Sequence, residues 1–345
     1  MNTSILDQTT TPIFDVAIIG AGLSGSLCAH LLAQSGQSVC VIEKSRGSGG
    51  RAGSKRLENE ISCDLGTPYI LAKHPDTLAL FQPLTQDHII APWQQGNDQE
   101  GKAFVGVPKM STLTRHWLEA ATLVTNTRIH HLDQLNNDSE QPTWLLRDDK
   151  YKPVVIAKSL IIATPAQQAA SLLATHDKLA VPLLRANRAC ENYESQWAMW
   201  LETEPCDLGA LIEPKGSPIK RMIKDNHKPM RPLENVDRWV IQTDPSWTKQ
   251  HLDTDKGWIA DALLQAFSEI TEHRVLKHGD PHRWFLSRFT EHKANRPFVW
   301  SPEHQVGLIG DWLCQGDAEG ALLSAMSLTK HLKDLKNLKD LKDLN

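Results

Sequence analysis

The chain has 345 residues, 40% of them hydrophobic, which is enough for one large domain or two ordinary domains with a packed core. Its formal net charge of −4, without an extended basic helix, argues against nucleic acid as the main partner. The six cysteines are widely spaced and show no Cys-x-x-Cys pair or metal-ligand spacing, so we expect reduced thiols and no metal site.

The first predicted element is a nucleotide-binding strand, turn and helix. The apolar run 16–19 predicts a buried strand, three glycines follow as G-x-G-x-x-G, and residues 23–35 predict an amphipathic helix. A pyrophosphate would lie at the helix N-terminus, where free N–H groups and the helix dipole favour an anion. The residues predicted to contact it are Gly20, Ala21, Gly22, Leu23, Ser24 and Gly25. The uncharged run 16–33 is interrupted by this turn and follows polar and acidic residues, so we expect neither a membrane span nor a signal peptide, and we expect a cytoplasmic protein.

The second strand, 38–42, ends on an acidic residue and a second glycine-rich turn. Glu43 is placed to accept hydrogen bonds from ribose hydroxyls, which disfavours a 2′-phosphate on the bound nucleotide. The stretch from Lys44 to Arg51 contains Gly49 and Gly50, and a plain NAD domain does not need it. The longer FAD molecule does need such a turn, with Arg51 able to stabilise phosphate or the flavin edge. The alternative is a solvated basic loop.

The middle of the chain alternates between the two predicted domains. Residues 73–108 lack steady periodicity and suit an insertion. Ser111 is a plausible N-cap for a helix running to about Leu123. A meander of strands follows at 127–132, 143–147 and 154–163, with a turn at 136–142, and the tryptophan-rich part from 165 to about 279 predicts a substrate domain. Trp197, Trp200 and Trp239 are expected in its core.

The last predicted elements return to the nucleotide domain. A short strand at 306–309 precedes Gly310 and Asp311, whose carboxylate could accept from ribityl hydroxyls. A helix starts near Glu319, Gly320 and Ala321, and its N-terminus could face the N1/C2=O edge of a flavin, where a positive dipole stabilises the anionic reduced ring. The leucines from Leu332 onward lie three apart and spiral around a helix, which predicts a frayed terminal helix and no coiled coil.

We therefore predict an α/β fold with an FAD-binding Rossmann-like domain of the glutathione-reductase type and a second α+β substrate domain containing a mixed or antiparallel sheet. The predicted FAD-binding domain comprises residues 1–72, 105–165 and 282–345. Residues 73–104 and 166–281 are assigned to the substrate domain.

Together these motifs resemble the flavin amine oxidase superfamily, and most closely its bacterial renalase-like NAD(P)/FAD-dependent oxidoreductases. The resemblance covers most of the chain and is carried by the segments IIGAGLSG, EKSRGSGGR, DLGTPY at 64–69, RIHHL at 128–132, LIIATP at 160–165, RWVIQ at 238–242, HRW at 282–284, and GDW at 310–312 with EGA at 319–321. It implies FAD as the cofactor, with Thr67, Pro68 and Ile129 among its contacts. It also implies oxidation of the 2- and 6-dihydro isomers of NAD(P)H by hydride transfer to the flavin, with dioxygen as acceptor and hydrogen peroxide as product.

A dihydropyridine substrate needs no general base, because its ring nitrogen lone pair drives hydride departure. We place Tyr69, Gln242, Trp284 and Trp312 around the nicotinamide, the aromatic residues for stacking and Gln242 for hydrogen bonding to the carboxamide. A basic loop at 215–232 could meet substrate phosphates, through Lys220, Arg221, Lys224, Lys228 and Arg231, or it is simply a solvated charged loop. An amine oxidase is the second hypothesis, although it would want tyrosine pairs and the chain has three tyrosines. The third is a flavin-binding protein without turnover. A thioether between Cys314 and the flavin is conceivable, but non-covalent FAD is favoured.

Overall fold

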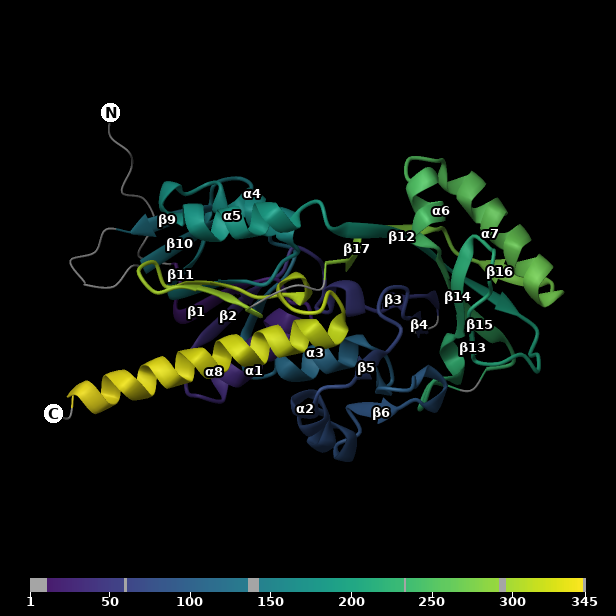
Figure 1. Cartoon of the computed structure of the whole chain (residues 1–345), viewed down its shortest axis with the longest axis horizontal. Coiled ribbons are helices and arrows are strands. Elements are labelled where there is room, and N and C mark those ends of the chain that lie inside the picture. Colours follow the sequence, from purple (N-terminus) through teal and green to yellow (C-terminus); the bar gives the residue numbers. More distant parts are fainter. Residues whose placement is uncertain (1–10, 59–60, 136–142, 233, 292–295, 344–345) are drawn as a thin grey trace. The chain divides into compact units, whose positions relative to one another are not determined.

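The computed structural model describes residues 11–58, 61–135, 143–232, 234–291 and 296–343. The chain forms two compact units, each built from separated stretches (Figure 1). The first unit comprises residues 1–50, 114–191 and 291–345, and the second comprises residues 51–113 and 192–290.

The first unit is organised around a parallel sheet with the strand order β19-β11-β1-β2-β8. Its strands are β1 (Ile13–Ile19), β2 (Val39–Ile42), β8 (Thr122–Val124), β11 (Pro153–Ile162) and β19 (Val306–Leu308). The apolar runs of β2 (VCVI) and β19 (VGL) are buried throughout, as expected for inner parallel strands covered on both faces. Antiparallel strands extend it: β18 (Val299–Ser301) pairs with β19, while β9 (Ile129–Leu135) and β10 (Thr143–Asp148) extend from β11.

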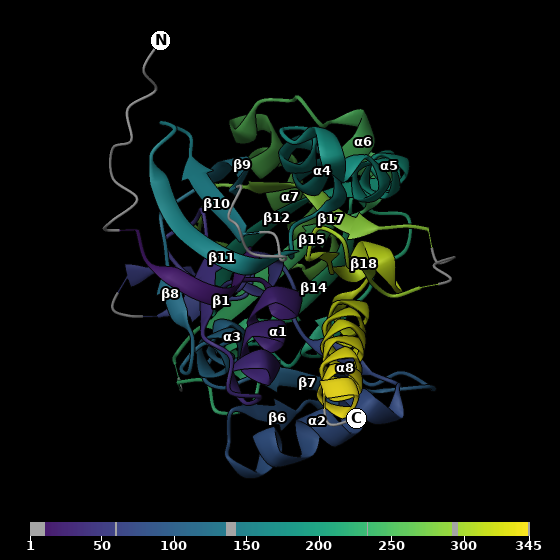
Figure 2. The same ribbon diagram turned by 90° about the vertical axis from the view of Figure 1, so that its left-hand side faces the viewer.

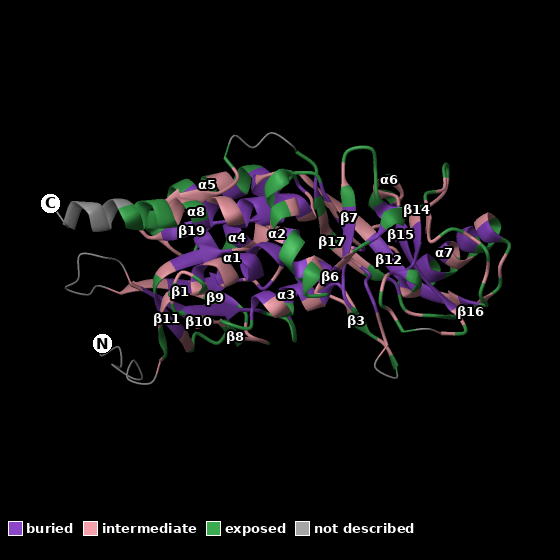
Figure 3. Ribbon diagram, turned by 90° about the horizontal axis from the view of Figure 1, so that it is seen from below, coloured by how far each residue is buried: buried purple, intermediate pink, exposed green. Residues whose placement is uncertain are grey.

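Two helices from opposite ends of the sequence pack against each other in this unit. α1 (Leu23–Ala33) lies beside the first part of α8 (Ala318–Asp343), as the views in Figures 1 and 2 agree. Eight of the eleven residues of α1 are buried, so this helix is enclosed rather than amphipathic (Figure 3). α4 (Ala166–Leu173) packs on α5 (Ala180–Ala189) and on β9, which places both helices in the first unit.

The second unit contains a six-stranded antiparallel sheet with the order β13-β14-β15-β12-β16, in which β17 also pairs with β12. The strands are β12 (Tyr193–Thr203), β13 (Leu211–Ile212), β14 (Ile219–Lys224), β15 (Asp237–Thr243), β16 (Val275–His278) and β17 (His282–Phe289). Helix α7 (Lys256–Thr271) buries Leu263 and Phe267 against Trp197, Met199 and Trp239 of the sheet, and α6 (Pro245–Gln250) packs on β12. Trp197, Trp200 and Trp239 are buried, as predicted.

Smaller elements complete the second unit. β5 (Ile70–Ala72), β7 (Lys102–Gly106) and β6 (Ile90–Pro92) form a three-stranded sheet, with α2 (Pro75–Gln86) beside β6. β3 (Lys55–Arg56) and β4 (Ser62–Cys63) form a short hairpin. Among the helices of the described residues, none has the length and apolar content needed to cross a bilayer.

The predicted fold class is confirmed, with a Rossmann-like parallel sheet in one unit and an antiparallel sheet in the other. The meander of strands is also present as β9, β10 and β11; the turn predicted at 136–142 lies outside the described residues. The predicted helix from Ser111 to Leu123 is wrong in its second half: α3 (Ser111–Trp117) ends at Trp117, and Thr122–Val124 forms the outer strand β8. The stretch 215–232 is likewise not a plain loop, because it contains β14.

The boundaries of the compact units differ from the predicted domain limits. Residues 166–191 belong to the first unit because α4 and α5 pack there, although we had assigned them to the substrate domain. Residues 51–72, 105–113 and 282–290 belong to the second unit, and β17 shows the reason: it pairs with β12.

Candidate cofactor and substrate sites

The glycine turn after β1 contains two glycines that the protein itself requires and one that faces open space. Gly20 has φ of 107°, and a Cβ there would lie 2.8 Å from the Ala163 carbonyl oxygen. A Cβ on Gly25 would lie 1.9 Å from the Gly20 carbonyl oxygen. A Cβ on Gly22 would meet no described protein atom within 4 Å, and Gly22 has an extended backbone. Only Gly22 therefore leaves room for a ligand to approach the main chain.

The second glycine turn lies directly beside the first. The Gly49 N–H donates to the Ala21 carbonyl at 2.7 Å, and Gly22 and Gly49 form an isolated parallel bridge. Gly49 and Gly50 have φ of 119° and 53°, values that disfavour residues with side chains. The two turns predicted to follow a long dinucleotide are thus adjacent within the first unit.

The N-terminus of α1 suits an anion. Among the described residues no side chain caps it, Gly22 is its N-cap, and its first turn carries no acidic residue. The buried first-turn residues Leu23 and Ser24 present backbone amides whose dipoles favour a negative group. This cradle fits the pyrophosphate of a dinucleotide.

Glu43 is fixed by the turn that it adjoins. Its carboxylate accepts from the Ala21 N–H at 2.9 Å and from the Ser45 N–H at 2.8 Å, and the side chain is 6% exposed. Because each carboxylate oxygen can accept more than one hydrogen bond, Glu43 retains capacity for ribose hydroxyls.

A polar cavity of about 570 Å³ opens beside Glu43. It is lined by Lys44, Ser45, residues 126–128 and residues 148–150. The Thr127 N–H donates to the Glu43 carbonyl at 3.0 Å, and Ile129, two residues later, is buried at the start of β9. Lys44 donates to Gln168 at 3.2 Å, and burial, with Arg128 nearby, lowers the pKa of Lys44.

The Gly310–Asp311 segment lies at the same edge of the sheet as the glycine turn, because each follows the carboxyl end of a parallel strand. Asp311 is 3% exposed and begins a short 3-10 helix, η6 (Asp311–Leu313), while Gly310 has φ of 154°. At the start of α8 the Gly320 N–H donates to the Asp317 carboxylate at 2.7 Å, and the Ala321 N–H donates to the Asp317 carbonyl at 3.1 Å. These two amides are therefore engaged within the protein instead of being directed at a flavin, and Glu319 beside them is buried.

Trp312 does not lie where we predicted it. Its side chain is 1% exposed, and its indole N–H donates to the Thr164 carbonyl at 3.0 Å. Both ring faces are covered by protein, so Trp312 is a core residue and cannot stack on a nicotinamide without repacking.

The cysteines are free thiols, as predicted. Cys28, Cys40 and Cys63 are buried, whereas Cys190, Cys206 and Cys314 are partly exposed. Burial raises the pKa of the Cys314 thiol to about 11, with Asp317 and Glu319 adding to the effect, so this sulfur is a poor nucleophile at neutral pH.

In the second unit, four predicted site residues converge on Gly66. Gln242 donates through Nε2 to the Leu65 carbonyl at 2.9 Å and to the Gly66 carbonyl at 2.5 Å. The Thr67 N–H donates to the Arg51 carbonyl at 2.8 Å. A Cβ on Gly66 would lie 2.0 Å from that same Arg51 carbonyl oxygen and 3.1 Å from the Trp284 ring. We call the segment Asp64–Thr67 with its partners Arg51, Gln242 and Trp284 the Gly66 junction.

Two further predicted residues follow the junction along the chain. Pro68 is buried, and the half-buried Tyr69 has its ring centroid 5.3 Å from that of Trp93. Trp284 is half-buried, and its ring centroid lies 4.4 Å from that of His282 in a T-shaped arrangement. The Trp284 indole N–H is buried and has no hydrogen-bond partner among the described residues.

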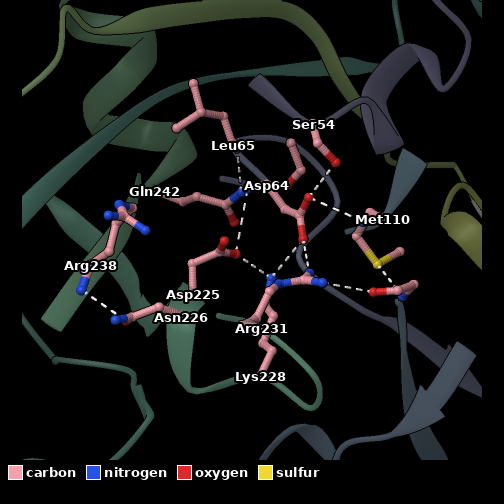
Figure 4. Close-up of polar contacts among 12 residues, drawn as sticks. Ser54, Asp64, Leu65, Met110, Asp225, Asn226, Lys228, Arg231, Arg238 and Gln242 are labelled. Atoms are coloured by element: carbon pink, nitrogen blue, oxygen red, sulfur yellow. Dashed lines mark hydrogen bonds and ion pairs between the residues drawn. The ribbon is translucent and has the colours of Figure 1, made fainter. Parts of the chain in front are cut away.

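The basic loop predicted to meet substrate phosphates turns inward. Lys228 and Arg231 pair with Asp64 at 3.2 and 2.6 Å (Figure 4). Lys224 pairs with Asp237 at 2.7 Å, and all three basic side chains are at most 4% exposed. These side chains cannot hold a substrate phosphate at a pocket mouth. Of the five predicted residues, Lys220 is exposed and Arg221 is half-buried.

The comparisons with known proteins agree with this architecture. Residues 18–84 match the family described as an NAD(P)-binding Rossmann-like domain. The chain is 23% identical to renalase of Mus musculus over 368 residues, covering 92% of this chain and 98% of the mouse protein. The chain is therefore similar to renalase along most of its length.

Solved structures show the same fold. A putrescine oxidase variant redesigned in its cofactor binding superposes with a TM-score of 0.69 at 12% identity, covering 94% of this chain and 99% of that chain. A structure described as a protoporphyrinogen oxidase from Exiguobacterium sp. 255-15 superposes with a TM-score of 0.68 at 10% identity, with the same coverage. The predicted resemblance to renalase is confirmed by the match to the mouse protein, and the solved structures share the predicted fold.

The sequence reasoning missed the carboxylates that organise the second unit. Asp64, quoted only as part of a motif, and Asp225 are 1% exposed and hold Lys228 between them. The available signal was Asp225 inside the predicted basic loop. It stands three residues before Lys228, and this spacing suggests that the two side chains pair with each other.

Proposed function

We propose that this chain is an FAD-dependent oxidase that oxidises the 2- and 6-dihydro isomers of NAD(P)H, with dioxygen as the electron acceptor and hydrogen peroxide as the product. The observation that carries the proposal is the dinucleotide cradle: an open approach at Gly22, a second glycine turn against it, and Glu43 fixed at the end of β2. The likeness to renalase along 92% of the chain supports the choice of substrate.

The first unit supplies the groups that would hold the cofactor. The amides at the start of α1 would bind the pyrophosphate, and the Glu43 carboxylate would accept from the ribose hydroxyls. Bound FAD would supply the chemistry, accepting a hydride and passing electrons to dioxygen. Arg51, Thr67 and Pro68 of the second unit, with Ile129 and Asp311 of the first, remain predicted cofactor contacts.

The second unit would orient the nicotinamide. Tyr69 and Trp284 offer partly exposed aromatic surfaces for stacking. Because the Gln242 amide nitrogen donates to two carbonyls of the Gly66 junction, its Oε1 is the atom that would accept from a substrate carboxamide. A dihydropyridine requires only this positioning, since its own nitrogen drives hydride loss.

The tyrosines do not favour an amine oxidase. Tyr69 packs on Trp93, Tyr151 on His131 and Tyr193 on Phe289, so no two of them form a cage within the described residues. The shared fold with a putrescine oxidase nevertheless makes amines a necessary comparison.

The test uses the full chain loaded with FAD under anaerobic conditions. The flavin absorbance is followed after mixing with borohydride-isomerised NADH, with ordinary NADH and with putrescine. Rapid bleaching by the isomer mixture alone is expected, followed by stoichiometric peroxide on admission of air. Faster bleaching by ordinary NADH would refute the proposal, bleaching by putrescine would indicate an amine oxidase, and no bleaching by any of them would indicate a binding protein.

A further inference from the structure

A buried cluster of four charged side chains in the second unit shares Asp64 with the Gly66 junction. Asp64, Asp225, Lys228 and Arg231 each have side chains at most 4% exposed, and two positive charges balance two negative ones. Figure 4 shows Lys228 and Arg231 approaching Asp64 from the same side. We call these four residues the charge cluster.

Asp64 is the centre of the charge cluster and uses both carboxylate oxygens fully. Oδ1 accepts from the Ser54 hydroxyl at 2.6 Å and from the Met110 N–H at 3.2 Å. Oδ2 accepts from Lys228 at 3.2 Å and from Arg231 at 2.6 Å. Burial opposes ionisation of Asp64, but the two cations and the Ser54 hydroxyl together hold its pKa below the ordinary value.

The cluster ties together three stretches that are far apart in the sequence. Lys228 also donates to Asp225 at 2.6 Å, and Arg231 donates to the Gly106 carbonyl at 2.9 Å. Met230, between the two cations in the sequence, has φ of 58°. Both cations reach the same carboxylate (Figure 4). The segment that starts at Asp64 is thereby fixed at its first residue.

The residues that follow Asp64 are those to which the proposed function assigns the substrate. Leu65 and Gly66 are held by Gln242, and the chain continues directly into Tyr69. A displacement at Asp64 would move the two carbonyls that orient the Gln242 amide. Misplacement of a positioned group by about 1 Å can lower a rate by roughly 100-fold.

We propose that Arg231 and Lys228, through Asp64, are positioning residues that fix the Gly66 junction and hence Gln242 and Tyr69 for the nicotinamide. This inference rests on the proposed function for its catalytic consequence. We assign the charge cluster to holding the Gly66 junction in place. A buried ion pair adds little net stability, whereas its hydrogen bonds restrict where the paired side chains can lie.

The experiment compares Arg231→Met with a matched control, Arg238→Met, in the FAD-loaded full chain. Arg238 is 3% exposed and pairs with Glu202 at 2.8 Å and Glu234 at 2.5 Å, so it is equally buried in the same unit. Within the described part of the chain, neither glutamate forms an ion pair with the Gly66 junction. Both variants should lower Tm. Only Arg231→Met should accelerate hydrogen exchange in the peptide spanning 61–69 and lower the limiting rate of flavin reduction by the NADH isomers roughly 10- to 100-fold. Arg231→Lys should recover part of both effects.

The proposal is overturned if Arg231→Met and Arg238→Met alter exchange and rate alike, or if Arg231→Met lowers Tm alone. Should Arg231→Met fail to fold, Ser54→Ala provides the comparison, since it removes one hydrogen bond to Asp64 and the one that Ser54 accepts from the Ser111 N–H, while leaving both cations in place. A wild-type flavin that the isomers do not reduce would refute the proposed function. The exchange measurement would still decide whether the cluster fixes residues 64–67.

Discussion

Replacing Gly22 by alanine should separate cofactor binding from folding. A Cβ at Gly22 meets no described protein atom within 4 Å, and φ of −75° with ψ of −173° is allowed for any residue. Alanine is a poorer N-cap than glycine, at a cost of about 0.5–1 kcal/mol. It also restricts the unfolded chain, which stabilises by about 0.4–1 kcal/mol. These two effects nearly cancel, so the free energy of unfolding of the apoprotein should change by less than about 1 kcal/mol.

The cofactor should respond differently. If the pyrophosphate contacts the Gly22 backbone, an inserted methyl group overpacks that contact and costs about 1–3 kcal/mol, which is roughly a 5- to 150-fold rise in the FAD Kd. Flavin fluorescence titration gives the Kd, and thermal melts of the apoprotein give its stability. Unchanged FAD affinity in a normally folded Gly22→Ala protein would refute the assignment of this turn as the pyrophosphate site.

Gly25→Ala is the matched control at the same turn. Its Cβ would lie 1.9 Å from the Gly20 carbonyl oxygen, so the protein itself must distort. We expect a loss of stability at or above the upper end of the 1–3 kcal/mol range typical of overpacking, visible in the apoprotein without any cofactor. Equal stability of the two variants would mean that the glycines do not divide their roles as the structure indicates.

Three further predictions concern the rest of the chain. Met230→Gly should raise the free energy of unfolding by about 1 kcal/mol in urea denaturation, because φ of 58° is unfavourable for methionine; a loss of stability would contradict this. Lys158→Met should raise the pKa of Asp15 from about 2, where the Lys158 hydrogen bond and Ser38 hold it. A carboxyl group whose pKa is lower in the folded than in the unfolded protein stabilises the fold at pH values above its unfolded-state pKa. The variant should therefore be less stable by at most about 0.5 kcal/mol near neutral pH. That difference should vanish as pH falls from about 4 to 2, and a difference that persists at low pH would exclude the pair as its source. Trp312→Phe should lower the free energy of unfolding by about 1–3 kcal/mol, because it leaves the Thr164 carbonyl unpaired. A lower rate of flavin reduction at an unchanged Tm would instead indicate a ligand contact.

Local patterns predicted the nucleotide half of the fold well. The order of strand, glycine turn, helix and second strand is encoded within about thirty residues, and each glycine requirement arises from atoms nearby in the same unit. Gly20 and Gly25 confirm this, because the atoms that exclude their Cβ groups belong to the turn or to the adjacent end of β11.

Pairing between distant segments was harder to predict. The sequence predicts a helix from Ser111 to about Leu123, which takes in Thr122, although β-branched residues favour strands. The strand forms because Thr122–Val124 have a pairing partner: they pair in parallel with Cys40, Val41 and Ile42, some eighty positions earlier. Periodicity within one segment carries no information about such a neighbour.

Charge was the least predictable feature, and the charge cluster shows why. In sequence, Lys228 and Arg231 are part of a basic run that suggests an exposed surface for phosphates. In the structure, Asp64, more than 160 positions away, and Asp225 neutralise them, and that pairing makes their burial possible. A lysine without such a partner would remain in solvent, as the exposed Lys220 does. The role of a basic residue therefore depends on where the fold brings the opposite charges, which is why we infer that these cations align the Gly66 junction and do not bind the substrate.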